Sequence, residues 1–260
     1  MKQVNKEKEI KEYWEKSTPI SFVEEKWSYE QKRKFRYDLQ DYEHDSFRFE
    51  DWAGKQVIEI GCGSGIDAME FARNGAIVTA TDITDNAVNL TKGLSQETGI
   101  PLNVVQTPPV KLPFPDKSFD CAYSFGVLHH IPDPAPKIDE IHRVLRDDGT
   151  LLAMLYNKNS LLYAYSIVYR HGVIEKLLTE KGFSEADLVS RYSERFEGCP
   201  YTKAYTKEEA QTFFSRWFRN VEVTVRYNVI DTEKQRKVKL GLDDTWELGW
   251  HLLIRATGKK

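Results

Sequence analysis

A glycine-rich turn between an apolar run and a helical pattern constrains this 260-residue chain more than any other feature. The run QVIEI (56–60) is short and apolar, as is typical of a buried strand, and the turn GCGSG (61–65) leads from it into the helical pattern DAMEFARN (67–74). Glycine permits positive φ and lets a ligand approach the backbone, and the following helix offers free N–H groups at its N-terminus. The segment therefore predicts a strand–turn–helix unit that holds a ligand.

Strand and helix patterns alternate after this unit, as expected for a parallel sheet with helices on both faces. The strands and helices that we predict next are strands 76–82, 102–106, 119–125 and 150–156, and helices 86–99 and 134–149. Beyond them we predict a helix at 207–217 and strands at 221–227 and 250–257. The last two strands have no long helix between them, which suggests an antiparallel pair at the sheet edge.

Two additions accompany the α/β pattern. We expect residues 1–50 to form an N-terminal extension and residues 51–260 to form one domain, with a mostly helical insert at 157–200. The extension has helical spacing around 5–16 and 28–43, and its many aromatic residues need something to pack against. It is either a lid whose aromatic rings stack on a bound ligand or a plain cover for a sheet edge. The lid residues that we consider are Tyr13, Trp14, Trp27 and Tyr37.

An acidic residue at the end of the second predicted strand extends the ligand site. Asp82 follows the glycine turn by about 20 residues, where dinucleotide-binding folds place the acid that binds ribose hydroxyls. Those folds use the pattern G-x-G-x-x-G, whereas the third glycine here, Gly65, comes one position early. The turn and Asp82 together favour a ligand that contains a nucleoside, and the early third glycine disfavours an oxidoreductase that uses NAD.

Four motifs resemble those of class I S-adenosylmethionine (SAM)-dependent methyltransferases. VIEIGCGSG (57–65) is similar to the first motif of that family, and the resemblance continues in TATDIT (79–84), LPFPDKSFDCAYSFGVLHHIPDP (112–134) and IHRVLRDDGTLLAML (141–155). It implies an α/β, Rossmann-like sheet of seven mostly parallel strands in the order 3-2-1-4-5-7-6, with strand 7 antiparallel. It also implies that SAM is the cofactor and S-adenosylhomocysteine the product.

The resemblance assigns cofactor-binding roles to particular residues. Residues of the first motif would line the methionine and ribose part of SAM, Asp82 would hold the ribose hydroxyls, and Ile83 would pack on the adenine. Ser124 and Phe125 would lie beneath the sulfonium and the amino-acid portion. The residues implied in the first motif are Glu59, Gly61, Cys62 and Gly63.

The chain departs from the family pattern where many relatives carry an acid that binds the adenine amino group. That position is Pro108, which offers neither a carboxylate nor a backbone N–H. Adenine recognition must therefore differ locally, through Thr107, Val110 or backbone carbonyls.

Two adjacent histidines are the candidate catalytic residues. Methyl transfer from a sulfonium is an in-line displacement, so the protein mainly positions the nucleophile, and a general base helps when that nucleophile is a hydroxyl. His129 and His130 are the candidate bases, and because adjacent side chains point in different directions we expect at most one of them to face the substrate. The competing interpretation is a histidine that caps a turn or packs beneath the cofactor.

Composition restricts the function classes. Lys and Arg number 37 against 40 Asp and Glu, so the chain lacks the strong basic excess of many nucleic-acid-binding proteins. Its three cysteines form no C-x-x-C motif, so we expect no metal site and a reducing, cytoplasmic location. No run of about 18 apolar residues occurs, so we expect no membrane span. The basic run KQRKVK (234–239) is interpreted as a solvated loop, with an acidic or phosphate ligand as the alternative.

The sequence thus predicts a methyltransferase that acts on an oxygen, nitrogen or carbon atom of a small biosynthetic molecule. A nucleic-acid, protein or peptide methyltransferase and a non-catalytic SAM-binding module stay as alternatives. Amino-directed base methylases carry Asn/Asp-Pro-Pro-aromatic after strand four, whereas this chain reads SFGV (124–127). The sequence predicts no particular oligomeric state.

Overall fold

One large sheet organises the computed structural model, which describes residues 2–17, 27–194, 198–231 and 237–260. Its strands lie in the order β3-β2-β1-β4-β5-β10-β7, and the two-residue strand β6 pairs with β5. The strands of this sheet are β1 (Gln56–Ile60), β2 (Ile77–Asp82), β3 (Asn103–Gln106), β4 (Phe119–Phe125), β5 (Leu145–Asn157), β6 (Ala204–Tyr205), β7 (Phe218–Arg226) and β10 (His251–Lys259).

Strand direction confirms the predicted topology. Strands β1 to β5 are parallel to one another, and β10 is antiparallel to both β5 and β7. Strand β10 therefore takes the place of strand 7 in the expected order, and β7 takes the place of strand 6. Because β1 to β5 are parallel, their carboxyl ends meet at one edge of the sheet, where open α/β folds bind ligands.

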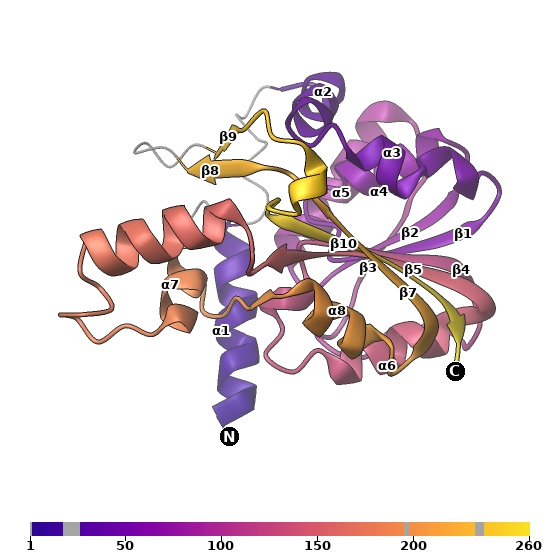
Figure 1. Ribbon diagram of the computed structural model, residues 1–260. Helices are drawn as coiled ribbons and strands as arrows, with labels where there is room; N and C mark the ends of the chain where they lie inside the picture. Colours follow the sequence, from indigo (N-terminus) through magenta and orange to yellow (C-terminus); the bar gives the residue numbers. More distant parts are fainter. Residues whose placement is uncertain (1, 18–26, 195–197, 232–236) are drawn as a thin grey trace.

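Helices cover both faces of the sheet (Figure 1). The helices on one face are α2 (Tyr29–Leu39), α3 (Glu43–Phe47), α4 (Ile66–Arg73) and α5 (Asp85–Thr98), with the short 3₁₀ turn η2 (Phe49–Trp52). The helices on the other face are α6 (Ala135–Val144) and α8 (Lys207–Phe214). Apolar residues of most strands and helices fill two large cores, one between the sheet and each helical layer. No helix within the described residues is both long enough and apolar enough to cross a membrane.

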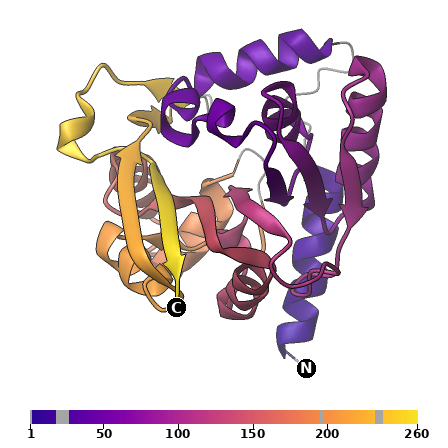
Figure 2. The ribbon, with the colours of Figure 1, turned by 90° about the vertical axis from the view of Figure 1, so that its right-hand side faces the viewer.

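The first helix, α1 (Lys2–Ser17), lies beside α5 at the ligand-binding edge (Figure 2). Its Glu15 carboxylate accepts hydrogen bonds from the backbone N–H groups of Asp85 (3.0 Å) and Asn86 (2.9 Å), at the exposed N-terminus of α5. A carboxylate at that position satisfies N–H groups that have no partner inside the helix, and it complements the helix dipole. Helix α1 is therefore attached next to the end of β2.

The insert and the β7–β10 connection contain structure that the patterns only partly predicted. The insert holds a π-helix, η4 (Leu162–Ile174), and helix α7 (Glu185–Tyr192). Strands β8 (Val229–Asp231) and β9 (Lys237–Lys239) form a separate antiparallel pair, so the described part of the basic run 234–239 is a strand rather than a loop. Its first three residues lie outside the described residues.

Helix α6 is shorter than predicted. It was expected to continue towards Gly149, but it ends at Val144, and β5 begins at Leu145 rather than at residue 150. Backbone N–H groups of Lys117 and Ser118 donate to the carbonyls of Arg143 (3.0 Å) and Val144 (2.8 Å), and Leu145 then pairs with β4. Pairing with the neighbouring strand therefore outweighs the helical pattern of the sequence.

Candidate active site

A cavity of about 1070 Å³ lies at the carboxyl ends of β1, β2, β4 and β5. The glycine turn and the strand ends line one part of it, helices α1 and α2 line another, and the insert and the β8–β9 pair line the rest. Pockets for one small ligand usually measure roughly 300–1,000 Å³. This cavity therefore has room for a nucleoside-sized cofactor together with a second small molecule.

The glycine turn is shaped for a ligand at two of its positions. Gly61 has a φ of +75°, and a Cβ there would lie 2.3 Å from Cγ2 of Val127, so a larger residue has no space. Gly63 also has a positive φ of +54°, yet nothing lies within 4 Å of the position of its missing Cβ. Both residues line the cavity. The turn thus leaves an open cradle at Gly63, which a ligand can occupy.

Asp82 lies beside this cradle with its carboxylate fixed. One oxygen accepts hydrogen bonds from the backbone N–H (2.9 Å) and hydroxyl (2.8 Å) of Thr84, and the other accepts from the N–H of Gly63 (3.1 Å). Burial raises the pKa of Asp82, although these hydrogen bonds oppose the rise. Cys62 and Ile83 line the cavity on either side of this residue. A carboxylate in this position can accept further hydrogen bonds from a ligand.

The same end of the cavity holds a buried ionic network. The guanidinium of Arg36, from α2, donates two hydrogen bonds to Asp67 (3.1 and 2.7 Å) and forms an ion pair with Glu43 (3.0 Å). Glu59, from β1, is only 3% exposed, and its Oε2 has no hydrogen-bond partner within the described residues. Burial and the negative charge of Asp67 raise the pKa of Glu59, with Arg36 acting in the opposite direction. Carboxylates outnumber cations here, so the site suits a cationic ligand.

The remaining predicted cofactor residues divide between the cavity wall and its surroundings. Thr107 and Phe125 line the cavity, and Arg36 lies 4.3 Å above the Phe125 ring. Pro108 is exposed and does not line the cavity, whereas its neighbours Thr107 and Pro109 do. Ser124 is fully buried beneath the wall. Tyr37 also lies behind the wall, where its hydroxyl donates to Asp67 (3.1 Å) and supports the ionic network.

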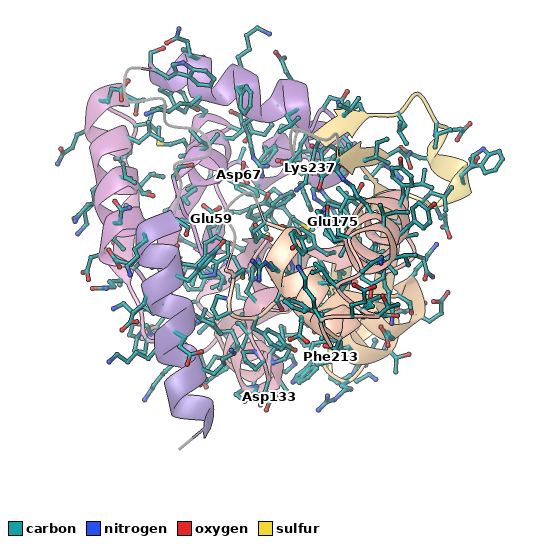
Figure 3. The ribbon with its side chains drawn as sticks, turned by 90° about the vertical axis from the view of Figure 1, so that its left-hand side faces the viewer. Glu59, Asp67, Asp133, Glu175, Phe213 and Lys237 are labelled. Carbon is teal, nitrogen blue, oxygen red and sulfur yellow. The ribbon has the colours of Figure 1, made fainter. Side chains whose placement is uncertain are left out.

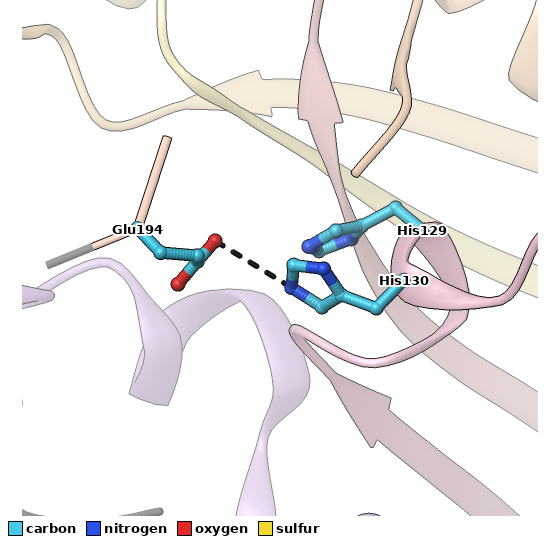
Figure 4. A group of neighbouring side chains, drawn as sticks. All are labelled: His129, His130 and Glu194. Carbon is cyan, nitrogen blue, oxygen red and sulfur yellow. Dashed lines mark ion pairs between the residues drawn. The ribbon is translucent and has the colours of Figure 1, made fainter. Parts of the chain in front are cut away.

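His130 faces the cavity at the end of β4 and lies opposite Glu194, which follows α7 (Figure 4). Its Nδ1 lies 3.0 Å from the carbonyl oxygen of Tyr201, which can only accept, so we assign the ring proton to Nδ1. Nε2 then carries a lone pair, has no hydrogen-bond partner within the described residues and lies 3.5 Å from Glu194 Oε1. Burial lowers the pKa of His130, while Glu194 opposes this effect.

Two aromatic residues hold the His130–Glu194 pair in place. The Tyr156 hydroxyl donates to Glu194 (2.7 Å), and the Trp14 ring of α1 packs edge-on against His130 with 4.9 Å between centroids. His129 is fully buried between the rings of Tyr156 and His130 and does not line the cavity. Of the two candidate bases, only His130 thus faces the cavity. His129, His130 and Glu194 each offer one ligand atom within 4.8 Å of the others, so these three residues could also hold a metal ion.

Comparison with known proteins decides the family. A family model described as a methyltransferase domain matches residues 58–153, from β1 into β5. These residues form a methyltransferase domain of the class I SAM-dependent type. The resemblance inferred from the motifs is therefore confirmed, and the oxidoreductase alternative is set aside.

Relatives of this methyltransferase include several ubiquinone biosynthesis O-methyltransferases. The chain is 26% identical to that of Haemophilus ducreyi over 183 residues, which cover 67% of this chain and 77% of the relative. It is 29% identical to the relatives from Saccharophagus degradans and Coxiella burnetii, over 55% and 44% of this chain and 60% and 49% of those proteins. The matches thus span between about half and three quarters of these relatives.

Solved structures share the fold of this methyltransferase. A SAM-dependent methyltransferase from Methanosarcina mazei has a TM-score of 0.58 at 21% identity, and the match covers 81% of this chain and 96% of that one. A SAM-dependent methyltransferase from Aquifex aeolicus has a TM-score of 0.54 at 17% identity, with coverage of 90% and 100%.

Sequence reasoning missed three residues of the methyltransferase site. Arg36 and Asp67 come from helices that the patterns predicted, but nothing in their spacing shows that they form an ion pair. Glu194 belongs to the insert, in which the sequence pointed to no site residue. A weak signal existed for Asp67, because an acid in the first turn of the helix after a ligand-binding turn lies close to that turn.

Proposed function

We propose that this methyltransferase transfers the methyl group of SAM to a hydroxyl oxygen of a small molecule, and that His130 accepts the hydroxyl proton. The observation that carries the proposal is the position of His130 in the cavity wall, where its Nε2 has no hydrogen-bond partner within the described residues and lies 3.5 Å from Glu194 Oε1. The relatives named O-methyltransferases support oxygen as the acceptor atom. The cavity volume supports a small acceptor bound next to the cofactor.

The residues at the acidic end fit SAM. The cofactor supplies an activated methyl group on a sulfonium, so it carries positive charge into the site. Asp82 would hold the ribose hydroxyls, and the open side of Gly63 would admit the cofactor close to the backbone. Glu59 would turn its unpartnered Oε2 to the positive charge, which offsets the cost of ionising a buried carboxylate. Thr107 and Ile83 remain the proposed neighbours of the adenine.

His130 is arranged to act as a general base. Its lowered pKa keeps the imidazole neutral at pH 7, so Nε2 is free to accept a proton. Once protonated, the ring gains a charge partner in Glu194, and the Tyr201 carbonyl keeps the ring oriented through Nδ1. The Tyr156 hydroxyl fixes Glu194 in turn. The proton of the acceptor hydroxyl would thus pass to His130 Nε2, while the bound cofactor would supply the methyl group from its sulfonium sulfur and leave as S-adenosylhomocysteine.

Replacement of the base tests the proposal. Radiolabelled methyl transfer from SAM into the small-molecule fraction of a cell extract should fall by about a hundredfold or more in His130→Asn, while SAM binding persists. His142→Asn, on α6 and outside the cavity wall, is the matched control and should keep full turnover. Full activity of His130→Asn would overturn hydroxyl deprotonation by this residue and would point to an amine or carbon acceptor. Methyl transfer only to protein or nucleic acid would overturn the small-molecule acceptor.

A further inference from the structure

Different charged side chains line different parts of the cavity. Glu59, Asp67 and Asp82 lie around the cofactor end, whereas basic side chains lie at the end formed by the insert and the β8–β9 pair. In Figure 3 Lys237 and Glu175 lie to the right of Glu59 and Asp67. The basic side chains that line this far end are Arg170, Arg191 and Lys237. The carboxylates that line the same region are Asp231 and Glu194.

Lys237 is positioned over this far end by secondary structure. It begins β9 and pairs in register with Asp231 of β8, and the backbone N–H of Asp231 donates to Ser166 of the π-helix (2.9 Å). Lys237 nevertheless forms no ion pair within the described residues. Burial lowers the pKa of His251 in the cavity wall, and the positive charges of Lys237 and Arg36 lower it further. The ammonium charge therefore acts on the inside of the cavity rather than on the outer surface alone.

Tyr227, whose ring packs against His251, adds an unsatisfied donor to the cavity wall. The residue is 5% exposed and lines the cavity, and its hydroxyl has no hydrogen-bond partner within the described residues. Its φ of +71° is unusual for a residue with a side chain, and such strain persists where the surrounding structure requires it. A buried hydroxyl without a partner costs free energy, which a bound acceptor group would recover.

Aromatic rings connect this end of the cavity to the proposed base. The Tyr227 ring lies 4.7 Å from His251, which lies 6.0 Å from Tyr156, and Tyr156 lies 6.1 Å from His130, measured between ring centroids. All four rings line the cavity. A ligand that touches Tyr227 at one end can therefore run along an apolar wall to His130 at the other.

We infer that the acceptor carries an anionic group, a carboxylate or a phosphate, which binds to the Lys237 ammonium and the Tyr227 hydroxyl. The inference rests on the proposed function, because it places the acceptor hydroxyl at His130. The far end of the cavity then acts as a specificity subsite: it selects acceptors by charge and fixes how far they reach toward the methyl donor. A neutral acceptor of the same shape would leave the ammonium and the hydroxyl without partners.

Matched probes test the subsite without knowledge of the natural acceptor. Calorimetry on protein saturated with S-adenosylhomocysteine would compare 4-hydroxybenzoate and 4-hydroxyphenyl phosphate with the neutral 4-hydroxybenzamide. We expect the anions to bind about tenfold to a hundredfold more tightly than the amide, as charge-assisted hydrogen bonds imply. Lys237→Gln should remove most of this preference, and Tyr227→Phe should remove part of it. The control is Lys239→Gln, on the same strand, where Lys239 pairs with Asp41 at the surface and does not line the cavity.

The outcomes separate the subsite from the proposed function. Equal binding of acid and amide, an unchanged preference in Lys237→Gln, or no binding of any probe at millimolar concentration would overturn the subsite while S-adenosylhomocysteine still binds. If S-adenosylhomocysteine itself fails to bind to the folded protein, the proposed function fails first. A preference for phosphate over carboxylate, or the reverse, identifies which anion the subsite takes.

Discussion

Replacing Glu59 with glutamine should stabilise the free protein and weaken cofactor binding at the same time. The carboxylate is 3% exposed, one of its oxygens has no hydrogen-bond partner within the described residues, and Asp67 lies nearby. A buried charge in such surroundings costs several kcal/mol, of which Arg36 offsets a part. We expect Glu59→Gln to raise the free energy of unfolding by roughly 1–3 kcal/mol. In a chain of this length each kcal/mol raises Tm by roughly 2–4 °C.

Cofactor affinity should change in the opposite direction. Glu59 would meet the positive charge of SAM, and a hydrogen bond or contact to a charged group contributes roughly 1.5–3 kcal/mol. Its loss corresponds to about a tenfold to a 150-fold increase in Kd, which calorimetry measures directly. The control Glu50→Gln removes a carboxylate whose side chain is 58% exposed, and both stability and Kd should stay near the wild-type values.

The pH dependence gives a further check on the same variant. Because the pKa of Glu59 is raised in the folded state, the folded protein keeps the Glu59 carboxyl protonated at pH values where the unfolded chain has released this proton, that is, above about pH 4.3. The free energy of unfolding of the wild type should therefore fall, relative to that of Glu59→Gln, as the pH rises from this value through the raised pKa of Glu59. At a pH below both pKa values, the two proteins should have similar free energies of unfolding. SAM binding to the wild type should release protons and strengthen with pH. The reasoning is refuted if Glu59→Gln unfolds at a lower temperature than the wild type, or if it binds SAM with unchanged Kd.

Three further changes test the site and its support. Gly61→Ala should abolish SAM binding and lower Tm, because the added Cβ would lie 2.3 Å from Val127 Cγ2. Gly63→Ala should still fold, but its positive φ should cost about 1 kcal/mol of stability. Thermal melts of the two variants would show this difference. Arg36→Met leaves two buried carboxylates without their cation, so urea denaturation should show a loss of roughly 3–5 kcal/mol, and a loss under 1 kcal/mol would contradict this assignment. Burial raises the pKa of Cys199 to about 12, so iodoacetamide at pH 8 should modify this thiol far more slowly in the native protein than after denaturation, as peptide mass spectrometry would measure.

The parts of this molecule that the sequence predicted are those that local patterns determine. The turn from Gly61 to Gly65 and the acid at Asp82 lie within two neighbouring strand–helix units, so their spacing alone brings them together. The alternation of strands and helices predicted a parallel sheet, and the family resemblance implied its strand order. Helix α6 was predicted too long because a helical pattern at residues 145–149 competes with pairing to β4, which periodicity does not show.

The parts that escaped prediction depend on contacts between distant segments. Arg36 meets Asp67 across 31 residues, and each is an ordinary helical residue in its own segment. Glu194 reaches His130 only because the insert folds back over the sheet edge. The periodicity of the sequence does not predict where the insert packs. Tyr37 was assigned to the cofactor as one of several aromatic residues, yet its hydroxyl faces Asp67 behind the wall. Polar networks of this kind follow from tertiary structure, so a single sequence gives little warning of them.

The Arg36 ion pairs divide the first fifty residues into two parts with different mechanical roles. One side chain of α2 joins α3 through Glu43 and α4 through Asp67, so a chain beginning at residue 51 would expose a core that has lost its counter-charge. Helix α1, in contrast, meets α5 at the surface through Glu15 and reaches the cavity through Trp14. Shortening the protein from its start should therefore first alter how quickly ligands enter and leave, and only later, once α2 is reached, whether the protein folds at all.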